Sequence, residues 1–137
     1  MSALDVAAET GHWRSAQILL GGGPAPDKLR IEISLGLQRV ALVKDGVPIY
    51  LARCSTGRNG YSTKTGEFVI TNKERNHRST IYHVEMPYFM RLSCLDFGMH
   101  AGVVPNYPAS HGCIRMLVPD VIDLYPRVPV GTPVLLQ

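Results

Sequence analysis

Two apolar runs separated by an Asp-Gly pair constrain the fold of this chain more than any other feature of its sequence. The runs are 39–43 (RVALV) and 47–52 (VPIYLA), with Lys44-Asp45-Gly46 between them. Asp-Gly between two apolar runs is a strong hairpin signal, because both residue types tolerate the positive φ that a tight two-residue turn requires. The sequence therefore predicts antiparallel sheet at this point.

Further strands are predicted on both sides of this hairpin. Thirteen Gly and ten Pro are spread along the 137 residues as punctuation, which fits short strands and turns better than long helices. Alternation and short apolar runs predict strands over 29–33, 67–71, 81–84, 95–100 and 132–136. Loops are expected over 55–66, 73–78 and 86–91, and a short helix over 120–125. The predicted fold class is mainly β, with small helices at the edges.

Residues 1–27 differ in character from the rest of the chain. Apolar residues at helical spacing on both sides of 10–12 (TGH) predict two short helices, and 21–26 (GGGPAP) predicts a flexible exit. The stretch 4–20 resembles the helix pair of one ankyrin repeat. A lone repeat cannot bury its apolar face, so the segment is a remnant, a cap on the main domain or a chance likeness. Residues 28–137 are expected to form the main domain.

Charge and hydropathy argue against two classes of partner. The net charge is +3, and the densest basic stretch, 73–78, also contains Glu74, so no nucleic-acid-binding arm is expected. No apolar run approaches the roughly 18 residues that a membrane span needs, and no secretory signal is visible at the N-terminus. The sequence leaves the oligomeric state open.

The chain has three cysteines, an odd number that leaves at least one thiol free. Cys54 and Cys94 stand in apolar surroundings and are expected to be buried packing residues. Whether they form a disulfide depends on geometry that the sequence does not give. Cys113 differs from both because His111 precedes it by two residues and His100 lies farther upstream.

This arrangement suits nucleophilic catalysis, because a thiol reacts as a thiolate and a nearby imidazole can take its proton or hold it as an ion pair. On an extended segment His111 and Cys113 share a face, which does not by itself align the imidazole with the sulfur. A histidine from a separate strand approaches more freely, so His100 is the better candidate for the base. Zinc is the alternative, with a ligand set of His100, His111, Cys113 and Asp96, but paired Cys-x-x-Cys spacing is absent.

Two neighbours of the cysteine suggest how a substrate is bound. Gly112 permits unusual backbone dihedrals and a close approach by substrate, and the amides around Gly112 and Cys113 could face an oxyanion. Arg115 faces the same way as Cys113 on an extended segment and could bind a substrate carboxylate.

The stretch 110–115 (SHGCIR), with a histidine upstream, resembles the signature of the L,D-transpeptidase catalytic domain of the YkuD type. The likeness continues into 86–92 (MPYFMRL), 97–101 (FGMHA), 54–57 (CSTG) and 64–68 (KTGEF), and covers residues 28–137. Lys64 stands where that family usually has Pro. The resemblance implies a YkuD-type β-sandwich or barrel-like domain with short peripheral helices.

The resemblance also implies roles for individual residues. Cys113 is expected to be the nucleophile and His100 its base, backed by the main-chain carbonyl of Ala101. The oxyanion and substrate-binding residues are expected to be His111, Gly112, Ser110 and Arg115, together with the Cys113 amide. Neither a metal nor an organic cofactor is expected.

The reaction that the resemblance implies is acyl transfer on peptidoglycan stem peptides, in the cell envelope. The enzyme attacks the bond after the L-centre of meso-diaminopimelate in a donor tetrapeptide, releases D-alanine and forms a thioester, which an amine from a second stem resolves. Resolution by water would make it an L,D-carboxypeptidase or an amidase. A non-catalytic wall-binding module is the third hypothesis, but such a relative would be expected to lack Cys113 or His100.

Overall fold

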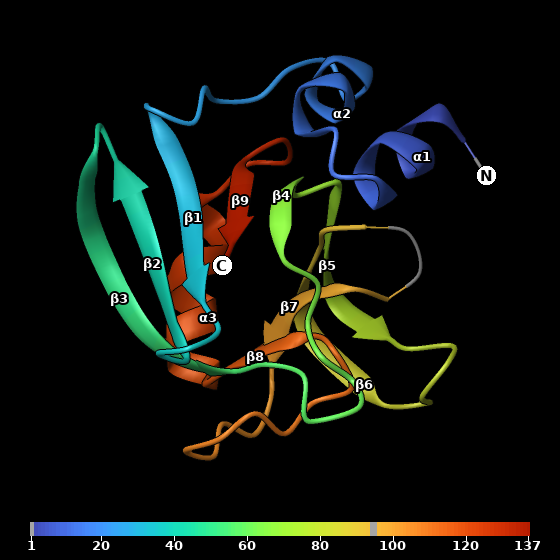
Figure 1. Cartoon of the computed structure of the whole chain (residues 1–137), viewed down its shortest axis with the longest axis vertical. Helices are drawn as coiled ribbons and strands as arrows, with labels where there is room; N and C mark the ends of the chain where they lie inside the picture. The colour runs from blue at the N-terminus through green and yellow to red at the C-terminus, as the bar shows by residue number, and fades with distance from the viewer. Residues whose placement is uncertain (1, 94–95) are drawn as a thin grey trace.

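The computed structural model describes residues 2–93 and 96–137 (Figure 1). Within these residues, nine strands form one curled sheet in the order β4-β9-β1-β2-β3-β8-β7-β6-β5. The strands are β1 (Leu29–Ser34), β2 (Arg39–Lys44), β3 (Val47–Ser55), β4 (Gly66–Val69), β5 (Asn72–Arg78), β6 (Glu85–Arg91), β7 (Gly98–Ala101), β8 (Ile114–Met116) and β9 (Pro133–Leu136). The helices are α1 (Ala3–Glu9), α2 (Trp13–Leu19) and α3 (Val118–Leu124), followed by a 3₁₀ turn over Tyr125–Arg127. The mainly β class with short helices is confirmed.

The hairpin of β2 and β3 forms where the Asp-Gly pair predicts it. Asp45 and Gly46 have φ of 50° and 78°, and Lys44 pairs with Val47 across the turn. Positive φ at both central residues is the geometry of a type I′ turn, whose twist matches that of the flanking strands. β3 then continues for nine residues, and its end pairs with β8 at Ser55 and Arg115. The long strand β3 thereby connects the two halves of the curled sheet.

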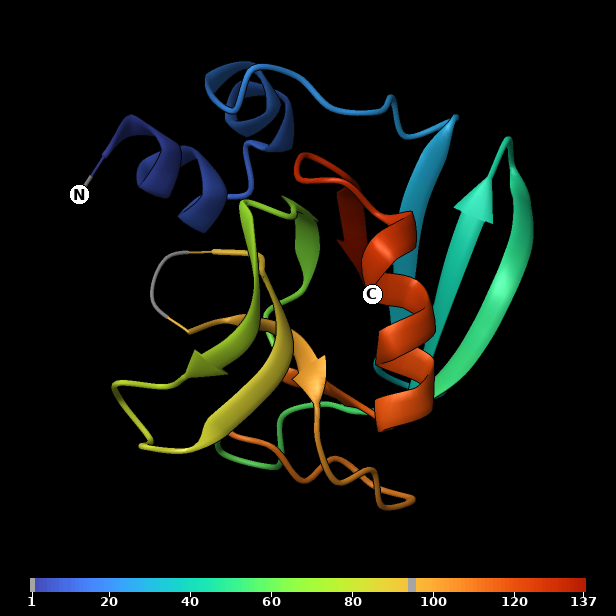
Figure 2. The ribbon, with the colours of Figure 1, turned by 180° about the vertical axis from the view of Figure 1, so that it is seen from behind.

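The main hydrophobic core lies between the sheet and α3, which runs in front of β1 in Figure 2. Alternate residues of β1 and β2 point into this core, as the period-2 pattern predicts. The helix adds Val121 and Leu124, both fully buried. The strands that carry the candidate site contribute Met99, Ile114 and Met116, each with no exposed surface. The backbone beneath the site is therefore tightly packed.

The two predicted N-terminal helices are present and pack beside β4 (Figure 1). Ala7 of α1 and Ala16 of α2 form a small buried cluster with Val69. The Gln17 side chain donates hydrogen bonds to the carbonyls of Pro24 and Gly131, at 2.8 and 2.9 Å. The helix pair thus covers its apolar face with the sheet, as a cap on the main domain would.

Three sequence-based assignments between 73 and 91 were wrong. The segments 73–78 and 86–91, predicted as loops, form the antiparallel pair β5 and β6, and the predicted strand 81–84 is the turn between them. β5 is an edge strand whose pattern shows no buried apolar face, so alternation could not reveal it. Pro87 argues against a strand in the sequence, which is why β6 was missed; in the structure the residue after it, Tyr88, has a positive φ of 58°.

The other predicted elements fall close to the observed ones. The strand predicted over 95–100 corresponds to β7 from Gly98 onward, while Cys94 and Leu95 lie outside the described residues. Cys54 is buried and its thiol is free. None of the helices within 2–93 and 96–137 is long and apolar enough to span a bilayer.

Candidate active site

Two parallel strands bring the predicted nucleophile and base to one face of the sheet. In the register of β7 and β8, His100 pairs with Arg115 and Met99 pairs with Ile114. Directly paired residues of parallel strands project to the same face, and so do residues two apart on one strand. Cys113 stands immediately before β8, on the side where His100 and Arg115 also lie. All three residues line one cleft of about 280 Å³.

His100 is held with one ring nitrogen available as a proton acceptor. The side chain is 6% exposed, and its Nδ1 lies 2.8 Å from the carbonyl oxygen of Ala101. Because a carbonyl only accepts hydrogen bonds, Nδ1 carries the proton and Nε2 keeps its lone pair. Burial lowers the pKa of His100, so the ring is neutral at pH 7. A neutral imidazole of fixed orientation can accept a proton from a nearby group.

Cys113 is a buried, protonated thiol in the resting structure. Its Sγ donates a hydrogen bond to the backbone carbonyl of Asp96 at 2.8 Å. Burial raises the pKa of Cys113 to about 11, although a backbone hydrogen bond from Gly98 acts in the opposite direction. The sequence left two possibilities open, a standing thiolate–imidazolium pair and removal of the thiol proton during the reaction. A protonated thiol favours the second.

Side-chain hydrogen bonds brace the loop before Cys113. Ser110 Oγ donates to the Cys113 carbonyl at 2.6 Å and accepts from the Gly112 amide at 3.1 Å. Gly112 has φ of 125°, a region that only glycine enters without strain. Thr63 Oγ1 donates to the Gly112 carbonyl at 2.7 Å. Sequence reasoning missed Thr63, which lies 49 residues away in a loop where no pattern distinguishes it.

His111 and Arg115 are fixed by what they pack against. The exposed His111 ring stacks on Tyr82, with centroids 4.7 Å apart, and meets the edge of Tyr61 at 4.8 Å. The stem of Arg115 lies across Gly102, where a Cβ would come within 3.2 Å of it. Both side chains line the cleft that contains Cys113.

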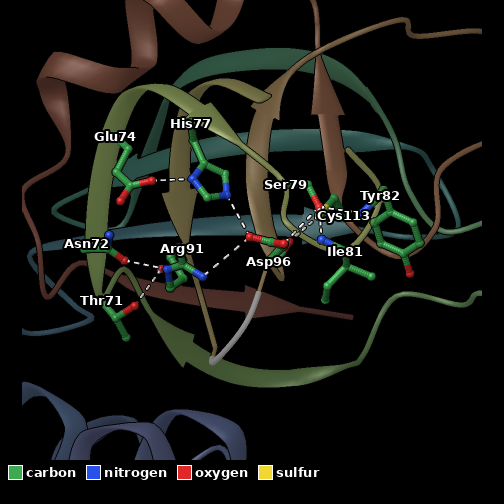
Figure 3. Close-up of polar contacts among 10 residues, drawn as sticks. All are labelled: Thr71, Asn72, Glu74, His77, Ser79, Ile81, Tyr82, Arg91, Asp96 and Cys113. Carbon is green, nitrogen blue, oxygen red and sulfur yellow. Dashed lines mark hydrogen bonds and ion pairs between the residues drawn. The ribbon is translucent and has the colours of Figure 1, made fainter. Parts of the chain in front are cut away.

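A polar network surrounds Asp96, the residue whose backbone carbonyl accepts the hydrogen bond from the Cys113 thiol (Figure 3). The Asp96 carboxylate, 7% exposed, accepts hydrogen bonds from His77 Nε2 at 2.7 Å and from Ser79 Oγ at 2.9 Å. An Arg91 guanidinium nitrogen lies 3.9 Å away, and Glu74 pairs with the other ring nitrogen of His77. The network ties the β5–β6 hairpin to the segment that holds the thiol.

The sequence offered Asp96 only as a possible zinc ligand, and its carboxylate is instead directed at His77 and Ser79. Among the residues that the structure describes, no three His, Cys, Asp or Glu side chains are arranged to hold a metal ion. Burial acts to raise the pKa of Asp96, but the hydrogen bonds from His77 and Ser79 outweigh it and hold the pKa below its ordinary value. Asp96 is therefore a buried carboxylate, ionised at neutral pH.

The Asp96→Asn variant is expected to lose about 3 kcal/mol of unfolding free energy at pH 7, because its amide nitrogen cannot replace a carboxylate oxygen as acceptor for the buried hydrogen bonds from His77 and Ser79. The lowered native pKa adds stability above the ordinary carboxyl pKa of about 4, and this is lost as pH falls. The difference between wild type and variant should therefore shrink below that pH. Urea denaturation measures both effects. Asp123→Asn, at an exposed pair with Arg127, is the matched control and should change stability little.

Comparisons with known proteins show the family to which this chain belongs. A buried cysteine and a neutral histidine on one face of a curled sheet define a site suited to acyl transfer. The model of the YkuD family, described as the L,D-transpeptidase catalytic domain, matches residues 28–136. The chain belongs to this family, as its sequence resemblance indicated.

Individual relatives show the same likeness. The YkuD protein of Bacillus subtilis strain 168, provisionally described as an L,D-transpeptidase, is 31% identical over 137 residues, covering 94% of this chain and 79% of that protein. The crystal structure of an L,D-transpeptidase from Stackebrandtia nassauensis is 29% identical with a TM-score of 0.76, covering 82% of this chain and 57% of that one. A mutant L,D-transpeptidase from Enterococcus faecium is 27% identical with a TM-score of 0.72, covering 80% and 50%. This chain thus spans about half the length of these solved chains.

Proposed function

We propose that this chain is a cysteine-dependent L,D-transpeptidase that acts on peptidoglycan tetrapeptide stems in the cell envelope. The observation that carries the proposal is that Cys113 and His100 line one cleft, with Nδ1 of His100 held by the Ala101 carbonyl. Membership of the L,D-transpeptidase family supports the substrate class.

In the acylation half-reaction, His100 Nε2 takes the thiol proton as Sγ attacks the carbonyl carbon of the L-centre of the donor. The thiol must first leave the Asp96 carbonyl, a rotation of the Cys113 side chain. The oxyanion then lies by the amide of Cys113, which stabilises it as a hydrogen-bond donor, while the Gly112 amide remains bonded to Ser110 Oγ. His100 returns the proton to the departing amine, the C–N bond breaks and D-alanine leaves. The acyl group remains on Sγ as a thioester.

In the transfer half-reaction, an amine of a second stem loses its proton to His100 and attacks the thioester. This step is the acylation step in reverse, with the new amine in place of D-alanine, and Cys113 Sγ leaves and takes back its proton from His100. The entering amine therefore occupies the place that the leaving amine vacated. Both amines stand beside a carboxylate, that of D-alanine in one case and that of a D-amino-acid centre in the other. The Arg115 guanidinium lines the same cleft as His100 and can bind either carboxylate.

The test is incubation with a tetrapeptide stem, with and without an amine acceptor, followed by product mass spectrometry. The expected products are a cross-linked or exchanged peptide when the acceptor is present, together with free D-alanine. Tripeptide as the sole product under both conditions would show that water resolves the thioester, and the transferase part of the proposal would be wrong. Release of no D-alanine under either condition would overturn the whole proposal.

A further inference from the structure

Two further hollows extend the cleft toward the N-terminal helices. A second hollow, of about 170 Å³, shares Tyr82, His111 and Cys113 with the cleft that contains His100. A third, of about 500 Å³, shares Glu9 and Lys64 with the second. Because neighbouring hollows share lining residues, the three lie in a row from the cleft past Cys113 to the end of α1; we call this row the groove.

An ion pair stands where the second and third hollows meet. Glu9 is the last residue of α1, and one of its carboxylate oxygens pairs with the Lys64 ammonium. The other oxygen accepts a hydrogen bond from the hydroxyl of Ser93, a residue that is 1% exposed. The Lys64 ammonium also lies 5.9 Å from the centre of the Phe97 ring. Charges of both signs are therefore held side by side in the same groove as the nucleophile.

The proposed chemistry indicates which part of the substrate reaches this pair. The leaving and entering amines must both meet His100, which lines the cleft together with Arg115. Within the described residues, neither of these side chains lines the second hollow. The acyl part of the donor, on the other side of the scissile bond, is thus left to occupy the second hollow and approach Glu9 and Lys64.

We propose that Glu9 and Lys64 bind the zwitterionic end of the side chain of the acylated donor residue, an ammonium and a carboxylate on one carbon. This inference rests on the proposed function. A zwitterion adds one charge of each sign, so each member of the pair gains an opposite partner and the net charge of the site does not change. Diaminopimelate has such an end, lysine offers only the ammonium, and the amide of diaminopimelate lacks the carboxylate. Glu9 lies outside residues 28–136, the part matched by the family model, so the N-terminal helix pair completes the substrate groove.

The experiment measures kcat/KM for D-alanine release from four tetrapeptides that differ only at the third residue. That residue is meso-diaminopimelate, its amide at the D-centre, lysine, or norleucine, which has neither charge. The wild type should prefer free diaminopimelate. Lys64→Met should lower kcat/KM for the free diaminopimelate donor about tenfold, the scale of one partly exposed charge-assisted hydrogen bond. It should also remove the preference for this donor over the amide. Glu9→Gln should lower kcat/KM for every donor whose third residue carries an ammonium. The norleucine donor should react equally with all variants.

The controls separate this inference from the proposed function. Glu32→Gln breaks the comparable ion pair of Arg30 and Glu32, at 2.9 Å, which does not line the three hollows, and should leave the preferences unchanged. Lys64→Arg keeps the positive charge and should keep the preference over the amide, which provides a test even if Glu9→Gln fails to fold. An active wild type whose preferences survive both Glu9→Gln and Lys64→Met would overturn the inference alone. A wild type that is inactive on all four donors would overturn the proposed function.

Discussion

Replacing Cys113 with alanine is expected to lower the rate of D-alanine release by roughly 10³-fold or more, the scale of losing a nucleophile. The variant has no sulfur with which to form the thioester, so the reaction loses its first intermediate. Cys54 cannot take over, because it is 1% exposed and burial raises the pKa of its thiol to about 12. Release of D-alanine from a tetrapeptide, followed over time, measures the effect.

Cys54→Ala is the matched control for Cys113→Ala. It removes a thiol from β3 without touching the cleft, so the rate of D-alanine release should stay near that of the wild type. A carbapenem should still acylate this variant once, and the same is expected for Cys94→Ala. Full turnover by Cys113→Ala would require a different nucleophile and would contradict the proposed mechanism.

The His100→Ala variant is expected to lose roughly 10²- to 10⁴-fold in kcat, the usual range for a missing general base. The loss should be large because the resting thiol has a pKa of about 11 and few molecules ionise without help at neutral pH. His111→Ala is the natural comparison, since it removes a second imidazole that lines the same cleft. It should lose less activity, because its predicted role is to support the oxyanion. The reverse order would mean that the two histidines have been given each other's roles.

The same histidine sets the expected acid limb of the pH profile. Burial lowers the pKa of His100, so the neutral form that accepts a proton persists below the ordinary value of about 6.5. The acid limb of the kcat/KM profile of the wild type should therefore have its midpoint below pH 6.5. A midpoint above that value would contradict the neutral, buried ring. In His100→Ala this limb should disappear.

The sequence predicted the strands and turns whose own residues carry a recognisable pattern of apolar or turn-forming types. Alternation of apolar residues predicted β1, and the Asp45-Gly46 turn between two apolar runs predicted the hairpin of β2 and β3. β5 and β6 could not be predicted in this way, because β5 is a polar edge strand held by backbone pairing to β6. An edge strand without a buried apolar face carries no period-2 signal, and only its neighbour identifies it.

The site residues likewise divide into those that a local pattern predicts and those that only tertiary packing brings to the site. Cys113, His111, Gly112 and Arg115 lie within one short motif, so their spacing alone placed them together, and the resemblance added the Ala101 carbonyl. Asp96 meets the thiol through its backbone carbonyl, an interaction that does not depend on residue type. Glu9 reaches the groove only because α1 packs beside β4. Such contacts depend on tertiary packing, which has no signature in the spacing of residues.

The most direct test of the proposed mechanism is the intact mass of the enzyme during reaction with a tetrapeptide stem and no amine acceptor. The expected result is a population heavier by the tripeptide acyl group, which peptide mapping locates on Cys113 and which disappears when an amine is added. A chain that releases D-alanine while carrying the acyl group on another residue would contradict the proposed role of Cys113.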